Sequence, residues 1–241
     1  MGSYTSRSGS TVRTNTPSGI TYEQFGKMSV EERYGAMGDI IRNPNIKVPD
    51  YLDDSATSKV LYALGMNGRP TVVADSELDT MDGVDFFRTV YDNEGAGISS
   101  ADILDQIAKG EYTQLSGSGG SAWGRAIYFA TDYFDSSYYG AGETNPMMCR
   151  AKFKPNAKIV NAAKLESLYG GAVNSRITAH SADLYALTAL ANGYDAWYTK
   201  DGDRMDYVMV LNRNALAMSD RYKNIDSRSL HPSETWHSNN R

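Results

Sequence analysis

An arginine, a tyrosine and an aspartate each lie in a short apolar run where the side chain could do chemistry. They are Arg88 in Phe86-Phe-Arg-Thr-Val90, Tyr128 in Ala126-Ile-Tyr-Phe-Ala130, and Asp206 in Asp206-Tyr-Val-Met-Val-Leu211. A guanidinium on an apolar strand is costly to bury unless it pairs or binds an anion such as a phosphate. A tyrosine ring can stack on a planar ligand, and a carboxylate can stabilise a developing cation. Each residue also has a structural alternative: a solvent-facing arginine, a core tyrosine and a solvated turn aspartate.

A glycine-rich loop precedes the tyrosine-bearing strand, in the segment 120–139. Glycines before a strand let the backbone pass close to a ligand, because no Cβ intervenes. The acidic, Ser/Tyr-rich stretch that follows the strand predicts a short helix, which brings a second pair of aromatic side chains, Tyr138 and Tyr139. Two tyrosines eleven positions apart, Tyr128 and Tyr139, could face each other across a flat ring.

This segment resembles the nicotinamide-pocket motif of the ADP-ribosyltransferases. In the branch of the poly(ADP-ribose) polymerases and diphtheria toxin, the motif is Gly-x-x-x-Gly-x-Gly-Ile-Tyr-Phe-Ala, followed by a helix that bears a second tyrosine. The residues in register are Gly120, Gly124, Ile127, Tyr128, Phe129, Ala130, Ser136 and Tyr139, while Ala126 replaces the last glycine. The two segments 208–216 and 62–70 also look like bacteriophage members of the family.

The resemblance implies a role for each candidate residue. Arg88 corresponds to the Arg or His of the family's first strand, and the backbone at Thr89 would hold the nicotinamide carboxamide. Tyr128 and Tyr139 would stack on the nicotinamide ring, with Tyr138 as the alternative to Tyr139. Asp206 stands where a catalytic Glu is commoner. The cofactor-binding residues implied are Arg88, Thr89, Gly124, Tyr128, Phe129, Tyr138 and Tyr139. We expect Arg88, Tyr128 and Asp206 to lie on adjacent strands and to open into one pocket.

The chain mixes features of two branches of this family. Its first strand is of the Arg type, but its second strand carries Tyr-Phe-Ala where Arg-type members usually have Ser-Thr-Ser. Members that modify arginine have a second Glu two residues before the catalytic one, and here that position is Arg204. Asp203 would point to the other face of the strand. The pattern therefore argues against arginine as the acceptor.

Composition excludes several other classes of protein. The net charge is −5 with no clustered Lys/Arg, so nucleic-acid binding is not expected. The single cysteine, Cys149, permits no internal disulfide, and its apolar surroundings predict a buried side chain. Three scattered histidines give no zinc motif, so we expect no metal. There is no apolar run long enough to span a membrane and no signal-peptide pattern, so we expect no membrane partner.

The chain divides into four regions by composition and pattern. Residues 1–18 are expected to be a flexible arm, 19–79 an N-terminal helical region, 80–220 the catalytic domain, and 221–241 a polar tail. The helices expected are Ser29 to Ile41, Ser55 to Leu64, Ser99 or Ser100 to Lys109, the tyrosine-bearing helix, and an amphipathic helix over Ser181 to Ala191. The strands expected are 84–91, 126–130, 147–153, 158–161, 196–199, 206–211 and 215–218. We expect the helical region to pack beside the catalytic domain.

Short strands without strict βαβ alternation predict an α+β fold with a largely antiparallel arrangement. The family resemblance implies a split β-sandwich of two short sheets around an NAD cleft. It further implies a mono-ADP-ribosyltransferase that uses NAD as substrate and modifies a host protein, in the host cytoplasm after packaging in a virion. The alternatives are an NAD glycohydrolase and a non-catalytic virion or host-interaction protein that keeps the fold.

Overall fold

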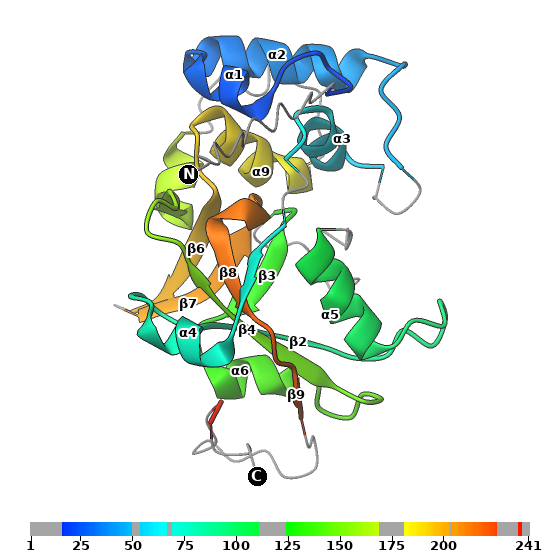
Figure 1. Ribbon diagram of the computed structural model, residues 1–241. Helices are drawn as coiled ribbons and strands as arrows, with labels where there is room; N and C mark the ends of the chain where they lie inside the picture. The colour runs from blue at the N-terminus through cyan, green and yellow to red at the C-terminus, as the bar shows by residue number, and fades with distance from the viewer. Residues whose placement is uncertain are drawn as a thin grey trace, which may run out of the picture.

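The computed structural model describes residues 16–49, 54–66, 69–110, 124–168, 181–202, 204–225 and 236–237. The described chain is an α+β fold in which helices lie on two sides of one sheet (Figure 1). The predicted class is therefore confirmed at this level. Gly120 and Asp203 lie outside the described residues, as do much of the expected arm and much of the expected tail.

Nine strands form a mixed sheet in this part of the chain, in the order β1-β8-β4-β2-β3-β7-β6-β5, with β9 paired to β4. They are β1 Thr71–Val73, β2 Phe86–Val90, β3 Ile127–Ala130, β4 Met147–Phe153, β5 Ile159–Asn161, β6 Ala196–Asp201, β7 Arg204–Val210, β8 Leu216–Ser219 and β9 Lys223–Asn224. The pairs β1–β8 and β5–β6 are parallel, and the other pairs are antiparallel. The largely antiparallel arrangement expected from the sequence is present.

The structure replaces the expected two sheets with one sheet that has a weak junction. β2 and β3 share a single residue pair, Phe87 with Ala130. By contrast, β2 pairs with β4 from Phe86 to Val90, and β3 pairs with β7 along its whole length. Few ladder hydrogen bonds join the two halves at this point, which leaves room for the strands to diverge. Arg88, Thr89 and Tyr128 all adjoin this junction.

The helices are placed where capping residues start and stop them. They are α1 Tyr22–Lys27, α2 Val30–Arg42, α3 Ala56–Ala63, α4 Asp75–Thr80, α5 Ser100–Lys109, α6 Tyr133–Tyr138, α7 Ala162–Ser167 and α9 Ser181–Ala191. Ser29 and Glu32 form the capping box that starts α2, as their spacing predicts. Gly110 ends α5 in the left-handed conformation, with φ of 76°. The helices expected over 29–41, 55–64 and 99–109 are thus confirmed within a residue or two.

The main core joins the N-terminal helices to the sheet. Phe25 and Met37 from α1 and α2 belong to the same buried cluster as Leu187 of α9, Phe129 of β3 and Val208 of β7. Figure 1 shows α1 and α2 stacked over α3 and α9, which in turn lie over one end of the sheet. The N-terminal helices therefore pack against the rest of the fold, as expected. However, β1 and α4 pair and pack with the sheet, so the region expected to be helical ends before them.

Helix α9 is not the amphipathic surface helix that the sequence suggested. Every residue from Ala186 to Ala191 is buried. The reason is that α2, α3 and α7 all pack on this helix. It also contacts β6, where Tyr185 stacks on Trp197 with ring centroids 6.2 Å apart. A helix covered on both sides needs apolar residues all round.

A second, smaller group of buried side chains lies apart from the main core. We call it the α6 cluster: Phe87, Tyr133, Met148, Ile225 and Trp236. It packs under α6, at the end of the molecule opposite α1 and α2 (Figure 1). Trp236 comes from the region that the sequence predicted as a polar tail, so at least this part of the tail is built into the fold.

Candidate functional site

Arg88 and Tyr128 meet at the junction between β2 and β3. The Arg88 guanidinium donates from Nη1 to the carbonyl oxygen of Tyr128 at 2.8 Å. Both residues are half-buried. A hydrogen bond from a charged donor offsets part of the desolvation that burial imposes on the guanidinium. Arg88 therefore ties together two strands that share only one ladder pair.

Tyr128 is fixed by the glycine that precedes its strand. Its hydroxyl donates to the carbonyl oxygen of Gly124 at 2.6 Å. Gly124 is buried and has a φ of 91°, a backbone conformation that residues other than glycine rarely adopt. The next residue along the strand, Phe129, is only 1% exposed and belongs to the main core. Strand alternation turns the Phe129 side chain away from the side that Tyr128 faces, so only its backbone could serve the predicted cofactor-binding role.

Helix α6 crosses the sheet beside Thr89. Asp132 caps the helix by accepting from the backbone N–H groups of Phe134 and Asp135. The Ser136 hydroxyl lies 3.1 Å from the Thr89 hydroxyl, and Ser136 is buried. The motif resemblance put Ser136 in register, but it did not predict that Ser136 is a site residue.

The chain leaves α6 through a close contact with the same threonine. A Cβ on Gly140 would lie 2.9 Å from Thr89 Cγ2 and 2.7 Å from Pro146 Cβ. These distances are shorter than side chains tolerate, so the approach of this turn to β2 requires glycine. Nothing in the sequence pattern singled out Gly140.

The two tyrosines at the end of α6 differ in their contacts. Tyr138 is 71% exposed, whereas Tyr139 is 57% exposed. The Tyr139 hydroxyl donates to the Tyr207 hydroxyl at 3.1 Å, and the rings pack edge to face with centroids 6.3 Å apart. Tyr139, rather than the alternative Tyr138, is thus the residue that joins α6 to β7. Tyr207 is an aromatic side chain of this region that sequence reasoning missed, although it directly follows Asp206.

Asp206 lies within β7, one residue before the stretch that pairs with β3. Its backbone carbonyl accepts from the N–H of Thr131 at 3.0 Å, one residue beyond the last ladder pair, Ala130 with Tyr207. The residue is half-buried. Burial raises the pKa of Tyr207, and the hydrogen bond with Tyr139 and the charges of Asp206 and Asp135 raise that pKa further.

The three predicted residues lie on the adjacent strands β2, β3 and β7, as expected. Their side chains do not all share one face in the ladder register. Directly paired residues project to the same face, so the pairs of Ala130 with Phe87 and with Tyr207 put Thr89, Tyr128 and Tyr207 on one face. Arg88 and Asp206 alternate to the other face. This register does not fit the expectation that all three side chains open into one pocket, and Arg88 reaches Tyr128 through its carbonyl group instead.

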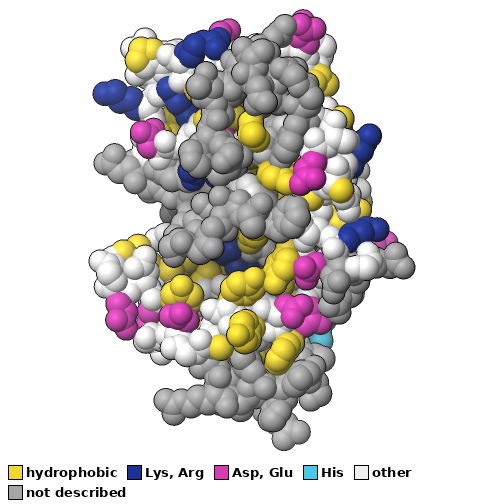
Figure 2. Space-filling model, turned by 180° about the vertical axis from the view of Figure 1, so that it is seen from behind, with side chains coloured by type: hydrophobic (Ala, Val, Ile, Leu, Met, Phe, Trp, Pro, Cys, Tyr) yellow, Lys and Arg dark blue, Asp and Glu magenta, His cyan; other side chains and the backbone are white. Residues whose placement is uncertain are grey.

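Figure 2 shows the molecule from behind, with hydrophobic side chains grouped on its lower half and acidic side chains on both flanks of this group. Three tyrosines of the described chain are more than 40% exposed: Tyr138, Tyr139 and Tyr91. Single exposed apolar residues are ordinary on protein surfaces. An exposed tyrosine, however, can stack its ring on a planar ligand and form a hydrogen bond through its hydroxyl.

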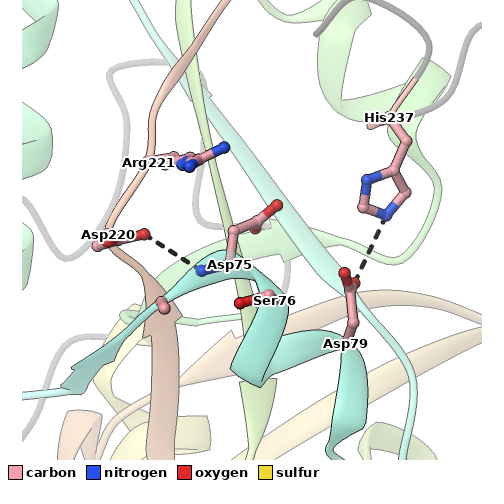
Figure 3. Close-up of a pocket in the computed structure, with 7 residues that line it drawn as sticks. Asp75, Ser76, Asp79, Asp220, Arg221 and His237 are labelled. Atoms are coloured by element: carbon pink, nitrogen blue, oxygen red, sulfur yellow. Dashed lines mark hydrogen bonds and ion pairs between the residues drawn. The ribbon is translucent and has the colours of Figure 1, made fainter.

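A hollow of about 240 Å³ lies beside α4, and Asp75, Asp79, Asp220, Arg221 and His237 line it (Figure 3). Asp75, Asp79 and His237 offer ligand atoms within 4.8 Å of one another, which is a spacing that a metal could use.

The carboxylates of this hollow already have cationic and polar partners. Arg150 Nη1 lies 2.7 Å from Asp79 and 3.4 Å from Asp75. The Trp236 indole and the Ser219 hydroxyl also donate to Asp75. A guanidinium thus supplies the positive charge that a metal would bring, and these residues do not fit a metal centre.

Cys149 is fully buried on β4, as its apolar context predicted. Burial raises the pKa of its thiol to about 12. Since the thiolate is the nucleophilic form, this cysteine is not a catalytic candidate.

Comparisons with known proteins add no relative: no protein-family model, no curated protein and no solved structure matches the chain. Among the described residues, no helix combines the length and the apolar character that crossing a membrane requires. The resemblance to ADP-ribosyltransferases therefore rests on the motif residues alone.

Proposed function

We propose that the protein is an NAD-dependent mono-ADP-ribosyltransferase of the bacteriophage type, with its site where α6 crosses β2, β3 and β7. One observation carries the proposal. Ser136 contacts Thr89 and Tyr139 contacts Tyr207, on the sheet face that Tyr128 shares. A helix that brings a hydroxyl and an aromatic ring to that face matches what a nicotinamide ring with a carboxamide needs.

The side chains of this face fit nicotinamide in both shape and polarity. The Thr89 backbone and the Ser136 hydroxyl would bind the carboxamide, which both donates and accepts hydrogen bonds. The rings of Tyr128 and Tyr139 would contact the two faces of the nicotinamide ring. The hydrogen bond from Tyr128 to Gly124 holds one ring in place before the ligand arrives, and such preorganisation lowers the cost of binding.

Asp206 would supply the charge for the chemical step. In NAD the nicotinamide is cationic on its ribose, and the carbon–nitrogen bond breaks with the electron pair leaving on neutral nicotinamide. The ribose carbon then carries positive charge, which a nearby carboxylate stabilises. An acceptor nucleophile attacks that carbon and releases a proton. Because Asp206 alternates to the other sheet face from Tyr128, its carboxylate would have to act from beyond the end of β3, where its backbone bonds to Thr131.

Arg88 would act at the edge of the site. Its bond to the Tyr128 carbonyl supports the junction, and its positive charge suits the pyrophosphate of NAD. In this proposal Arg88 both holds β3 against β2 and attracts the anionic part of the substrate.

A host protein is the proposed acceptor, in the host cytoplasm after delivery by a virion. The arginine at position 204 argues against arginine as the modified side chain. Water as acceptor would make the protein an NAD glycohydrolase. That activity would use the same residues for nicotinamide release, so the two functions differ only in the second step.

The test is to incubate the purified protein with NAD in two labelled forms, with and without host lysate. Label in the nicotinamide ring reports cleavage, and label in the adenine ring reports transfer to protein. A transferase releases nicotinamide and labels a lysate protein, whereas a glycohydrolase releases nicotinamide alone. If neither label moves and NAD does not bind at millimolar concentration, the proposal is wrong.

A further inference from the structure

Trp236 is held from three directions, by residues of α4, β2 and β9. It is 5% exposed. Its indole N–H lies 3.1 and 3.2 Å from the two carboxylate oxygens of Asp75 on α4. Its ring lies 6.0 Å from that of Phe87 on β2, and its carbonyl accepts from Lys223 at 2.8 Å.

The polar anchor of this tryptophan is a charged one. Burial acts to raise the pKa of Asp75, but hydrogen bonds from Trp236 and Ser219 and the charge of Arg150 outweigh it and lower the pKa. The carboxylate is therefore ionised at neutral pH. A hydrogen bond from an indole to an ionised carboxylate is stronger than one between neutral groups.

Trp236 is connected to α6 through two contacts of the α6 cluster. Phe87 packs edge to face on Tyr133, the first residue of α6, with ring centroids 5.8 Å apart. Lys223, which donates to the Trp236 carbonyl, lies with Nζ 4.8 Å from the centre of the Tyr133 ring. Because Trp236 contacts both Phe87 and Lys223, two chains of contacts link it to the start of α6.

The same helix carries the side chains of the candidate site. Ser136 and Tyr139 follow Tyr133 on α6 and its end, and Phe87 immediately precedes Arg88 on β2. Among the described residues the α6 cluster has five members, against the much larger main core. Removing its largest side chain takes away a greater share of the packing here than any single substitution would in the main core.

We propose that Trp236 is a positioning residue, which fastens α6 to β2 and so sets Ser136 and Tyr139 for nicotinamide binding. The part that concerns nicotinamide rests on the proposed function. The part that concerns α6 does not, because it follows from the contacts of Trp236 with Phe87, Asp75 and Lys223 alone.

The experiment compares three variants of the full chain: Trp236→Ala, Trp236→Phe and His237→Gln. The phenylalanine keeps a ring against Phe87 but loses the hydrogen bond to Asp75. The control changes the neighbouring residue, an exposed histidine whose Nε2 lies 3.5 Å from Asp79. Amide hydrogen exchange is followed in α6 and in α9, and NAD affinity is measured by titration.

For Trp236→Ala we expect amide exchange in α6 to accelerate about tenfold, because the lost aromatic packing makes local opening of α6 easier. Exchange in α9 should be unchanged, because α9 belongs to the main core. NAD affinity should weaken by a similar factor. Trp236→Phe should restore most of the protection, and His237→Gln should match the parent. Unchanged exchange in α6, or the same acceleration in α9, would overturn the positioning role. A parent that fails to bind NAD ends the proposed function, while the exchange comparison still decides the role of Trp236.

Discussion

The main core and the α6 cluster differ in size and in what they support. The main core draws on α1, α2, α3, α5 and α9 and on most strands of the sheet, and it includes many side chains with no exposed surface. The α6 cluster has five members and holds one short helix against β2 and β4. The α6 side of the candidate site lies beside the smaller of the two, whereas Tyr128 and Tyr207 pack against the main core. Regions with few buried contacts open at low free energy, and binding sites are often drawn from them.

This difference separates stability from binding. A substitution in the main core should lower the stability of the whole fold, whereas one in the α6 cluster should loosen α6 and affect the site. Asp206, Tyr139 and Asp75 can each be changed without touching the main core. Substitutions at these three residues therefore probe the site and the α6 cluster apart from the stability of the main core.

The largest effect is expected at Asp206. Asp206→Asn keeps the size of the side chain but removes its charge, so nicotinamide release should slow by about 10²- to 10³-fold while NAD affinity changes little. Asp206→Glu should keep or raise the activity, since it restores the residue commoner in the family. The matched control is Asp135→Asn, another carboxylate that acts on Tyr207, which should stay within a few-fold of the parent. Equal losses in both variants would remove Asp206 from the chemical step.

In the main core, Leu187→Ala should lower the free energy of unfolding by about 2–5 kcal/mol, because the side chain is fully buried between α9 and its neighbours. Met148→Ala in the α6 cluster should cost about 2 kcal/mol, at the lower end of the same range, because a small cluster at the edge can collapse around the cavity. Denaturant titration measures both. If Met148→Ala costs as much as Leu187→Ala, the two regions form one cooperative core.

A smaller effect should distinguish the two tyrosines at the end of α6. Tyr139→Ala removes the ring that contacts Tyr207, so NAD affinity should fall by about 3- to 10-fold. Tyr138→Ala should change affinity less than about twofold, because surface side chains without such contacts contribute little. Titration of both variants with NAD measures the ratio. A larger loss in Tyr138→Ala would return the stacking role to Tyr138.

The smallest effect concerns pH and Asp75. The folded-state pKa of Asp75 lies below its ordinary value, so its contribution to stability is present above the unfolded pKa of about 3.9 and is lost as pH falls through the folded pKa. Asp75→Asn should therefore be about 1 kcal/mol less stable than the parent at neutral pH. The difference should shrink as the pH falls below about 4. A difference that stays constant down to pH 2 would show that packing, not charge, explains the loss.

The sequence predicted most of the elements because their local signals agree with the fold. The capping box of Ser29 and Glu32, the glycine after Lys109 and the apolar runs of β2, β3 and β4 each specify an element without help from distant residues. It also placed Cys149 correctly, since an apolar run around a thiol favours burial. The short elements β1 and α4 were missed because their residues are fixed by contacts with β8 and with Arg150, which lie far along the chain.

The site was predicted only in part, for a similar reason. The resemblance predicted that β2, β3 and β7 are adjacent, and it aligned Ser136 and Tyr139 with the helix that follows β3. It could not give the register, so it missed that Arg88 bonds to the Tyr128 carbonyl and that Tyr207 is the partner of Tyr139. Gly140 was missed because a Cβ is excluded at this position only by the approach of Thr89 and Pro146, which the sequence does not show. Trp236 was missed because a polar tail gives no sign that it returns to the fold.

The most direct test is a structure of the protein determined in saturating NAD. The account predicts the nicotinamide carboxamide at Thr89 and Ser136, with the ring between Tyr128 and Tyr139 and the ribose toward Asp206. NAD bound elsewhere, for example in the hollow beside α4, would contradict it. So would a nicotinamide ring on the sheet face of Arg88, away from Tyr128.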